Sequence, residues 1–371
     1  MIFLKRRALM TRAGFNYKTV SGIGSIVLEN CVETKFKRLV LLGNSAQGEN
    51  PSIESPKEIK NSGKYDETSG KYVIDVSVTG KNLFDINSFP YKQDDETIVI
   101  NSNEAYGGAL LVKGDALRRK QYVISIESFE NIGDNTSTVL LETVYKDGVK
   151  DERYLTAIPK TGWALSSTRE IDYIWIRNPW KAGSKIKKLQ IEEGKEATEY
   201  EPYHEPQTVK IQLNEPLRGI GEYKDVVTKD GIVRNILQVR IADYLQKAIY
   251  GKPGGRYIFS AVPNCYINYD RKRCMSNVGF TTNQENIAYM LVPYLDNFKL
   301  VVSDDDTVET IREKVKDMVV AYTVKEPILE ALPTELELAL SNLYTNDGTT
   351  IINVDSGEVE TGIEVEYAVK E

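Results

Sequence analysis

Three tryptophans are the side chains best suited to ligand contact in this sequence, and all three lie between residues 163 and 180. An indole ring offers a flat apolar surface with few rotors to freeze, which suits the C–H face of a sugar. Trp180 follows Asn178 and Pro179 in a predicted loop, so we expect it to be the most exposed of the three. For Trp163, Trp175 and Trp180 taken singly, packing between sheets or at a subunit interface is the favoured role.

One predicted strand sharpens the binding hypothesis. In residues 171–177, Tyr173, Trp175 and Arg177 share one face by period two, and two isoleucines share the other. Because isoleucines favour the core, we expect the aromatic and basic face to line the concave side of a β sandwich. The candidate glycan-binding residues are Trp180, Trp175, Tyr173, Arg177 and Trp163.

Catalytic patterns are weak by comparison. His204 is the only histidine, and it lies where a linker is expected. No serine has a Gly-x-Ser-x-Gly setting. Glu192 and Glu193 are neighbours on one strand and point to opposite faces, so they cannot serve together as the acid and nucleophile of a glycosidase. We predict no catalytic residue and no enzymatic activity, although a carboxylate pair assembled across loops stays open as an alternative.

Composition excludes several classes of protein. The net charge of −7 argues against a nucleic-acid binder, because phosphate attraction needs a dominant basic surface. Cys31, Cys265 and Cys274 are too few for a disulfide framework and lack a nearby histidine for zinc, so we expect reduced thiols. No apolar run reaches membrane-spanning length, and the basic start lacks the apolar region of a signal peptide. We therefore expect synthesis in the cytoplasm without secretion or membrane insertion.

The chain predicts a mainly β fold in two or three units, because its 371 residues exceed the usual size of one domain. Residues 1–79 are β-rich, residues 80–203 hold many short strands joined by turns, and residues 204–371 mix helix and strand. Asp-Gly pairs at 147–148 and 230–231 predict tight hairpins. Apolar spacing predicts helices over 241–249, after an N-cap at Thr307, and after an N-cap at Thr334.

Several short phrases resemble those of one protein family. Residues 80–85 (GKNLFD), 189–194 (LQIEEG) and 197–203 (ATEYEPY) are similar to the edges of a β-jelly-roll module found in tail, baseplate and tail-fibre proteins of phages of Gram-positive bacteria. Residues 213–219 (LNEPLRG) and 344–350 (YTNDGTT) also look like phrases of that family. The resemblance implies a central carbohydrate-binding-like, galactose-binding-type jelly roll over 80–203. Segment 1–79 would then serve attachment and pack with an α+β domain over 204–371.

The same resemblance implies a virion structural protein, either a receptor-binding or tail-fibre subunit or a purely architectural baseplate protein. Its partners would be other tail proteins and a host surface polysaccharide, and family analogy favours a homotrimer. No cofactor is expected, although modules of this type often hold a structural calcium. Asp85 and Glu192 are the carboxylates considered for that ion, with hydrogen-bonding or surface roles favoured for both. A cell-wall glycan hydrolase, or its accessory module, is the alternative from another class.

Overall fold

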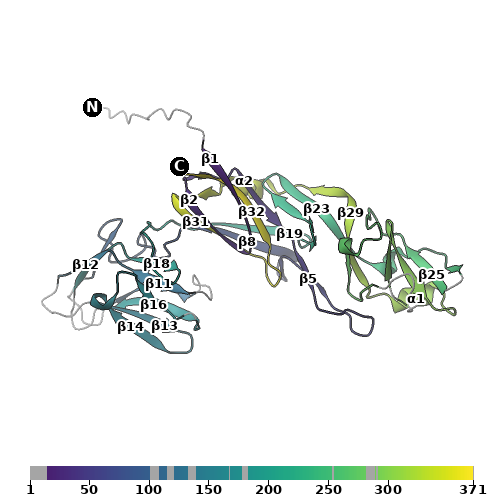
Figure 1. The fold of residues 1–371 in the computed structure, drawn as a ribbon, viewed down its shortest axis with the longest axis horizontal. Coiled ribbons are helices and arrows are strands. Elements are labelled where there is room, and N and C mark those ends of the chain that lie inside the picture. Colours follow the sequence, from purple (N-terminus) through teal and green to yellow (C-terminus); the bar gives the residue numbers. More distant parts are fainter. Residues whose placement is uncertain are drawn as a thin grey trace.

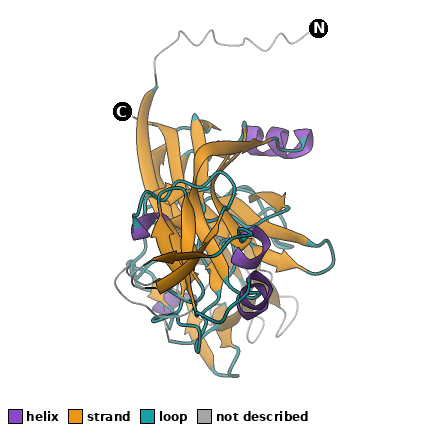
Figure 2. Cartoon of the chain, turned by 90° about the vertical axis from the view of Figure 1, so that its right-hand side faces the viewer, coloured by secondary structure: helices purple, strands orange, loops and turns teal. Residues whose placement is uncertain are grey.

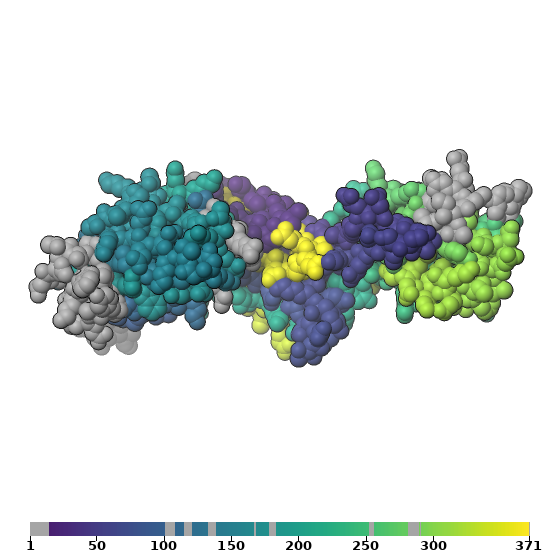
Figure 3. Space-filling model, turned by 90° about the horizontal axis from the view of Figure 1, so that it is seen from below, coloured from purple at the N-terminus to yellow at the C-terminus, as the bar shows by residue number. Residues whose placement is uncertain are grey.

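The computed structural model describes residues 15–100, 108–114, 121–132, 139–166, 168–177, 183–252, 255–280, 289 and 291–370 (Figure 1). The fold is mainly β, as the sequence predicts, and it includes a β sandwich and a large antiparallel sheet. Three regions follow one another along the long axis (Figures 1 and 3). Seen from one end, strands make up most of the molecule and helices only a small part of it (Figure 2).

The first region, which we call the sandwich module, comprises strands β9 to β18. A four-stranded sheet, in the order β10-β16-β13-β14, packs against two three-stranded sheets, β15-β11-β18 and β12-β17-β9. All the buried apolar residues of its core lie between Phe84 and Ile191. The strands are β9 (Thr97–Ile100), β10 (Gly108–Lys113), β11 (Tyr122–Ser125), β12 (Ser128–Asn131), β13 (Leu140–Tyr145), β14 (Lys150–Tyr154), β15 (Trp163–Ala164), β16 (Ile171–Arg177), β17 (Ser184–Lys187) and β18 (Gln190–Glu193).

The middle region is a twelve-stranded sheet, which we call the central sheet, and it draws strands from both ends of the chain. Its order is β19-β8-β31-β2-β1-β32-β4-β22-β23-β29-β26, with β7 paired to β8. From β19 to β22, strands from segment 1–79 are therefore interleaved with strands from segment 204–371, and the sheet continues with strands from segment 204–371 alone. The strands are β1 (Asn16–Ile23), β2 (Ser25–Cys31), β4 (Arg38–Leu42), β7 (Lys64–Asp66), β8 (Lys71–Thr79), β19 (Gln207–Leu213), β22 (Val226–Thr228), β23 (Gly231–Arg240), β26 (Cys274–Ser276), β29 (Val319–Glu330), β31 (Gly348–Asp355) and β32 (Gly362–Val369).

The sandwich module interrupts the central sheet between β8 and β19. These two strands are antiparallel neighbours, and Val78 on β8 is paired with Gln207 on β19. The chain thus leaves the sheet at the end of β8 and returns beside the same point. Three short pairs flank the sheet: β3 (Thr34–Lys35) with β30 (Tyr344–Thr345), β5 (Ser45–Gln47) with β6 (Ile59–Asn61), and β20 (Gly219–Ile220) with β21 (Tyr223–Lys224).

The third region, which we call the tip unit, packs a four-stranded sheet, ordered β24-β25-β28-β27, with helix α1. Its core lies between Ile241 and Tyr322 and includes two residues of β29, so it is continuous with the central sheet. Helix α2 instead packs on the core of the central sheet through Leu340. The elements are β24 (Tyr250–Lys252), β25 (Gly255–Ser260), β27 (Leu291–Tyr294), β28 (Asn297–Val302), α1 (Val308–Lys314) and α2 (Thr334–Asn342).

The predicted hairpins and one predicted helix are confirmed. Gly148 and Gly231 adopt φ values of +83° and +142° at the turns joining β13 to β14 and β22 to β23. An L side chain rarely adopts these values, which explains the glycine after each aspartate. Helix α1 begins after Thr307, whose side chain accepts a hydrogen bond from the Thr310 amide. The acidic run 304–306 therefore marks a helix start, as predicted.

The other two helix predictions need correction. Residues 241–249 form only a 3-10 turn, Ile241–Tyr244, instead of an α-helix. Leu245 then forms a β-bridge with Ser260, and the Gln246 amide donates to the carbonyl of Phe259, so tertiary pairing with β25 overrides the helical spacing. Thr334 is the first residue of α2, and the N-cap position belongs to Pro333, which has no side-chain hydrogen-bond acceptor.

The three cysteines are buried and free, in agreement with the predicted reduced thiols. Among the residues that the structure describes, no helix has both the length and the apolar character needed to cross a lipid bilayer.

Candidate ligand-binding face of the sandwich module

Strand β16 has two chemically different faces, as its sequence predicts. Ile174 and Ile176 are fully buried in the core of the sandwich module. Tyr173, Trp175 and Arg177 lie on the opposite face and are each partly exposed. The period-two prediction for this strand is therefore confirmed, and the core-facing isoleucines fix the orientation of the other three side chains.

Strand pairing places Trp175 at the centre of this outer face. Directly opposed residues of an antiparallel pair share a face, and Trp175 is opposite Leu110 on β10 and Glu142 on β13. Tyr173 packs edge-to-face against Trp175, with 6.3 Å between the ring centroids. The face is hollowed to a volume of about 490 Å³. The hollow is lined by Leu110, Lys113, Gly114, Glu142, Asp172, Tyr173, Trp175 and Arg177.

A glycine on the neighbouring strand makes room for the indole. A Cβ atom on Gly108 would lie 2.2 Å from Nε1 of Trp175 and 2.4 Å from the carbonyl oxygen of Ile176. Neither separation is tolerable, so any other residue at position 108 would displace the tryptophan or the strand. Gly108 and its backbone thus fix where the indole of Trp175 lies.

Charged groups next to the indole form a compact network. Nη2 of Arg177 is 2.7 Å from Oε1 of Glu152 and 3.1 Å from Oε2 of Glu142. The other oxygen of Glu142 accepts a hydrogen bond from Nζ of Lys150 at 3.5 Å. The guanidinium is therefore held between two carboxylates at the edge of the hollow, where its planar donors are presented in a fixed orientation.

Sequence reasoning missed Glu142, which is only 4% exposed. All six residues of β13 are buried, and Glu142 is the one charged residue among them. A lone carboxylate in an apolar run was the available signal, because burying an ionised group is costly unless a partner compensates it. Its partners could not be identified from sequence, since Arg177 lies 35 positions away on another strand.

The structure does not bring Trp163 to this face. Trp163 lies on β15 in another sheet, is 5% exposed, and belongs to the core of the module. The guanidinium of Arg153 lies over its ring, 5.9 Å from the centroid. The favoured sequence interpretation, packing between sheets, describes this residue. Trp180, the residue expected to be most exposed, lies outside the described residues.

The carboxylates considered for calcium have separate partners. Asp85 accepts hydrogen bonds from the amides of Asn87 and Ser88 and so closes a local turn. Glu192 is buried, and its carboxylate accepts hydrogen bonds from Gln190 and Thr198. Within the described parts of the chain, no group of three or more histidine, cysteine or acidic side chains is arranged to hold a metal ion.

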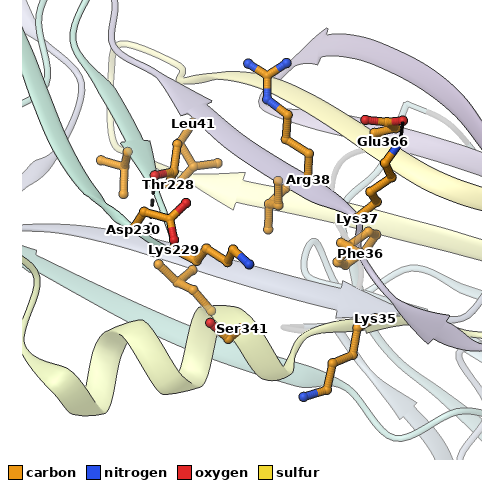
Figure 4. Close-up of a pocket in the computed structure, with 13 residues that line it drawn as sticks. Lys35, Phe36, Lys37, Arg38, Leu41, Thr228, Lys229, Asp230, Ser341 and Glu366 are labelled. Carbon is orange, nitrogen blue, oxygen red and sulfur yellow. Dashed lines mark hydrogen bonds and ion pairs between the residues drawn. The ribbon is translucent and has the colours of Figure 1, made fainter.

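A second hollow, of about 410 Å³, lies on the central sheet beside α2 (Figure 4). Lysine and arginine side chains surround it, but most are engaged within the fold. Lys37 pairs with Glu366, and Arg38 pairs with Glu364 at 2.6 Å. Its remaining lining is largely apolar and belongs to the packing of α2 on the sheet. The lining cations are Lys35, Lys37, Arg38 and Lys229.

No protein-family model matches this chain, and neither the curated proteins nor the solved structures contain a match to it.

Proposed function

We propose that this chain is a structural protein of a phage tail or baseplate, and that it acts as a receptor-binding or tail-fibre subunit. In this proposal the outer face of β16 binds a glycan of the host cell wall without catalysis. The observation that carries the proposal is the partly exposed indole of Trp175 in an open hollow, flanked by Tyr173 and Arg177. The family phrases in the sequence supply the biological setting.

The chemistry of the face suits a saccharide. A pyranose ring presents apolar C–H groups that can pack on an indole, and hydroxyls that need hydrogen-bond partners. Trp175 and Tyr173 supply the aromatic surface, and Arg177 supplies donors at its edge. An open hollow gives modest affinity for a single sugar, because it buries only part of the ligand.

Repetition around a symmetric particle would convert that modest affinity into firm attachment. A homotrimer presents three equivalent faces, and linked sites raise the apparent affinity by about 10²- to 10⁴-fold when they can bind together. The neighbouring tail proteins would be the other partners in this proposal. They would hold the chain in the particle, whereas the sandwich module would contact the cell.

Adsorption of the purified chain to host cells and to their extracted wall polysaccharide tests the binding role. We expect Trp175→Ala to lower the apparent affinity by at least about tenfold, since a stacked aromatic residue contributes on the order of 1–3 kcal/mol at a binding site. Tyr65→Ala is the matched control, because Tyr65 is 59% exposed on β7 of the central sheet. Equal loss in both variants, or no loss in either, would contradict the assigned face.

Two further measurements separate the alternatives. Release of new reducing ends from wall polysaccharide by the chain would favour a hydrolase, whereas binding to tail proteins alone would favour a purely architectural role. Immunogold labelling of intact particles tests membership in the virion and position on the tail together. Particles without label would remove the phage assignment.

A further inference from the structure

One carboxylate oxygen and one guanidinium nitrogen in the hollow of the sandwich module lack hydrogen bonds. Oε2 of Glu142 and Nε of Arg177 are both buried atoms without a hydrogen-bond partner. Oε2 has a cation nearby, since Nη2 of Arg177 lies at 3.1 Å, but the contact does not form a hydrogen bond. Buried polar groups are rarely left unsatisfied, and leaving one so costs about 1–3 kcal/mol. An acceptor and a donor on side chains next to Trp175 therefore lack hydrogen-bond partners within the fold.

The charges lining the hollow cancel. Lys113 and Arg177 are cationic, and Glu142 and Asp172 are anionic. Sites that recognise phosphate or carboxylate ligands normally present an excess of arginine and lysine to the anion. An anionic ligand on this face would meet Glu142 at the floor and Asp172, which is exposed. The lining therefore disfavours a phosphate-bearing or uronic polymer.

We propose that Glu142 is the specificity-determining residue of this face and that its ligand is an uncharged, hydroxyl-rich saccharide. The inference rests on the glycan-binding role proposed above. One sugar hydroxyl donates a hydrogen bond to Oε2 of Glu142 and accepts one from Nε of Arg177. It therefore satisfies the hydrogen-bonding needs of both atoms. Both atoms are buried in the free protein, so the proposal requires the side chain of Arg177, which is 32% exposed, to rotate away from Glu142 when the sugar binds.

The experiment compares the full-length chain on matched neutral and anionic polymers. Dextran, mannan and galactan are each tested beside their sulfated forms, with affinities measured by isothermal titration calorimetry or biolayer interferometry. For at least one neutral polymer, we expect wild-type binding more than tenfold tighter than binding to its sulfated form. Glu142→Gln keeps the side-chain volume but removes the charge. We expect about 10- to 100-fold weaker binding of that neutral polymer and a neutral-to-sulfated ratio near one.

Three variants make the result specific. Glu127→Gln is the matched control, because Glu127 is 46% exposed on the same module, pairs with Lys187 and Lys188, and lies outside the lining of the hollow. We expect it to change affinity by less than about twofold. Trp175→Ala should weaken neutral and sulfated polymers alike, so the ratio stays fixed. Asp172→Asn, at an exposed position, should strengthen only the sulfated forms, and it tests the charge argument independently if Glu142→Gln does not fold.

The outcomes separate this inference from the function on which it rests. A wild-type chain that binds sulfated polymers as well as neutral ones, or a Glu142→Gln variant that keeps the wild-type ratio, would overturn the inference and leave glycan binding intact. A wild-type chain that binds neither these polymers nor host wall polysaccharide would remove the proposed function and the inference together.

Discussion

Two arginines in this molecule have similar partners and opposite surroundings. Arg177 in the sandwich module lies between Glu142 and Glu152, and Arg234 on β23 of the central sheet lies between Asp225 and Glu330. The side chain of Arg234 is only 2% exposed, whereas that of Arg177 is 32% exposed. Each guanidinium bridges two carboxylates, yet only one of them faces a hollow. The comparison shows how burial decides whether such a group stabilises the fold or remains available to a ligand.

The network around Arg234 is satisfied within the fold. Arg234 donates to both oxygens of Glu330 and to the backbone carbonyls of Glu215 and Pro216. Burial raises the pKa of Asp225, because desolvation disfavours the charged carboxylate. Hydrogen bonds from backbone amides and the charge of Arg234 act in the opposite direction and lower this pKa. Each guanidinium nitrogen of Arg234 has a hydrogen-bond acceptor, so the network ties β22 and β23 to the segment that follows β19.

The largest expected effect is on the central sheet. Arg234→Met leaves Asp225 buried without its cation, and we expect a loss of about 3–5 kcal/mol in the free energy of unfolding. Urea unfolding followed by far-UV circular dichroism measures it. The three tryptophans all lie in segment 80–203, so tryptophan fluorescence reports on that part alone and should keep its midpoint. Arg240→Met, on the same strand but 66% exposed, should cost less than about 0.5 kcal/mol.

A substitution in the core of the sandwich module should destabilise that module and leave the central sheet unchanged. Ile176→Ala removes a fully buried side chain behind the proposed binding face, and we expect a loss of about 2–4 kcal/mol in the free energy of unfolding of this module. Here the transition followed by tryptophan fluorescence should move to a lower urea concentration. The part of the circular dichroism change that reports unfolding of the central sheet should keep its midpoint. Movement of both transitions together would show that the two regions unfold as one unit.

Arg177→Met tests the other arginine directly. Arg177 remains partly hydrated and Glu142 keeps Lys150 as a partner, so we expect the free energy of unfolding to change by less than about 1 kcal/mol. Binding of neutral polysaccharide should instead fall by about tenfold or more, because a charged hydrogen bond is lost. A loss of stability as large as that of Arg234→Met would contradict the contrast between the two sites.

The smallest expected effect concerns the thiols. Burial raises the pKa of Cys274 to about 12, so its reactive thiolate is absent at pH 8 and forms only as the pH rises toward that value. We expect no labelling of the native chain by a thiol reagent at pH 8. Cys274 lies on β26 of the central sheet, so Arg234→Met should permit labelling at lower urea than Ile176→Ala does. Rapid native-state labelling would contradict the burial of all three cysteines.

Local patterns in the sequence predicted local structure well. The alternation of Ile174 and Ile176 with Trp175 identified the two faces of β16, and Thr307 identified the start of α1. These features depend on neighbours in the chain, which a sequence displays directly. The helix predicted over 241–249 failed because its apolar residues serve a core shared with distant strands.

Long-range pairing was beyond sequence reasoning. A period-two pattern shows which side chains of a strand share a face. It does not show which strands are neighbours in the sheet. The pairing of β1 with β32 and of β2 with β31 in one sheet joins residues more than 300 positions apart. The same limit hid the partners of Glu142, since its contacts with Lys150 and Arg177 depend on the register of three strands. Tyr173, Trp175 and Arg177 were predictable together because they share one strand.

The pairing of Val78 with Gln207 has an evolutionary consequence. Because the chain departs and rejoins at adjacent backbone positions, a tight loop or any other domain with neighbouring termini could occupy that gap without altering the strand order around it. Recombination at this one point could therefore exchange the surface offered to the environment in a single step, while the scaffold that carries it is inherited unchanged.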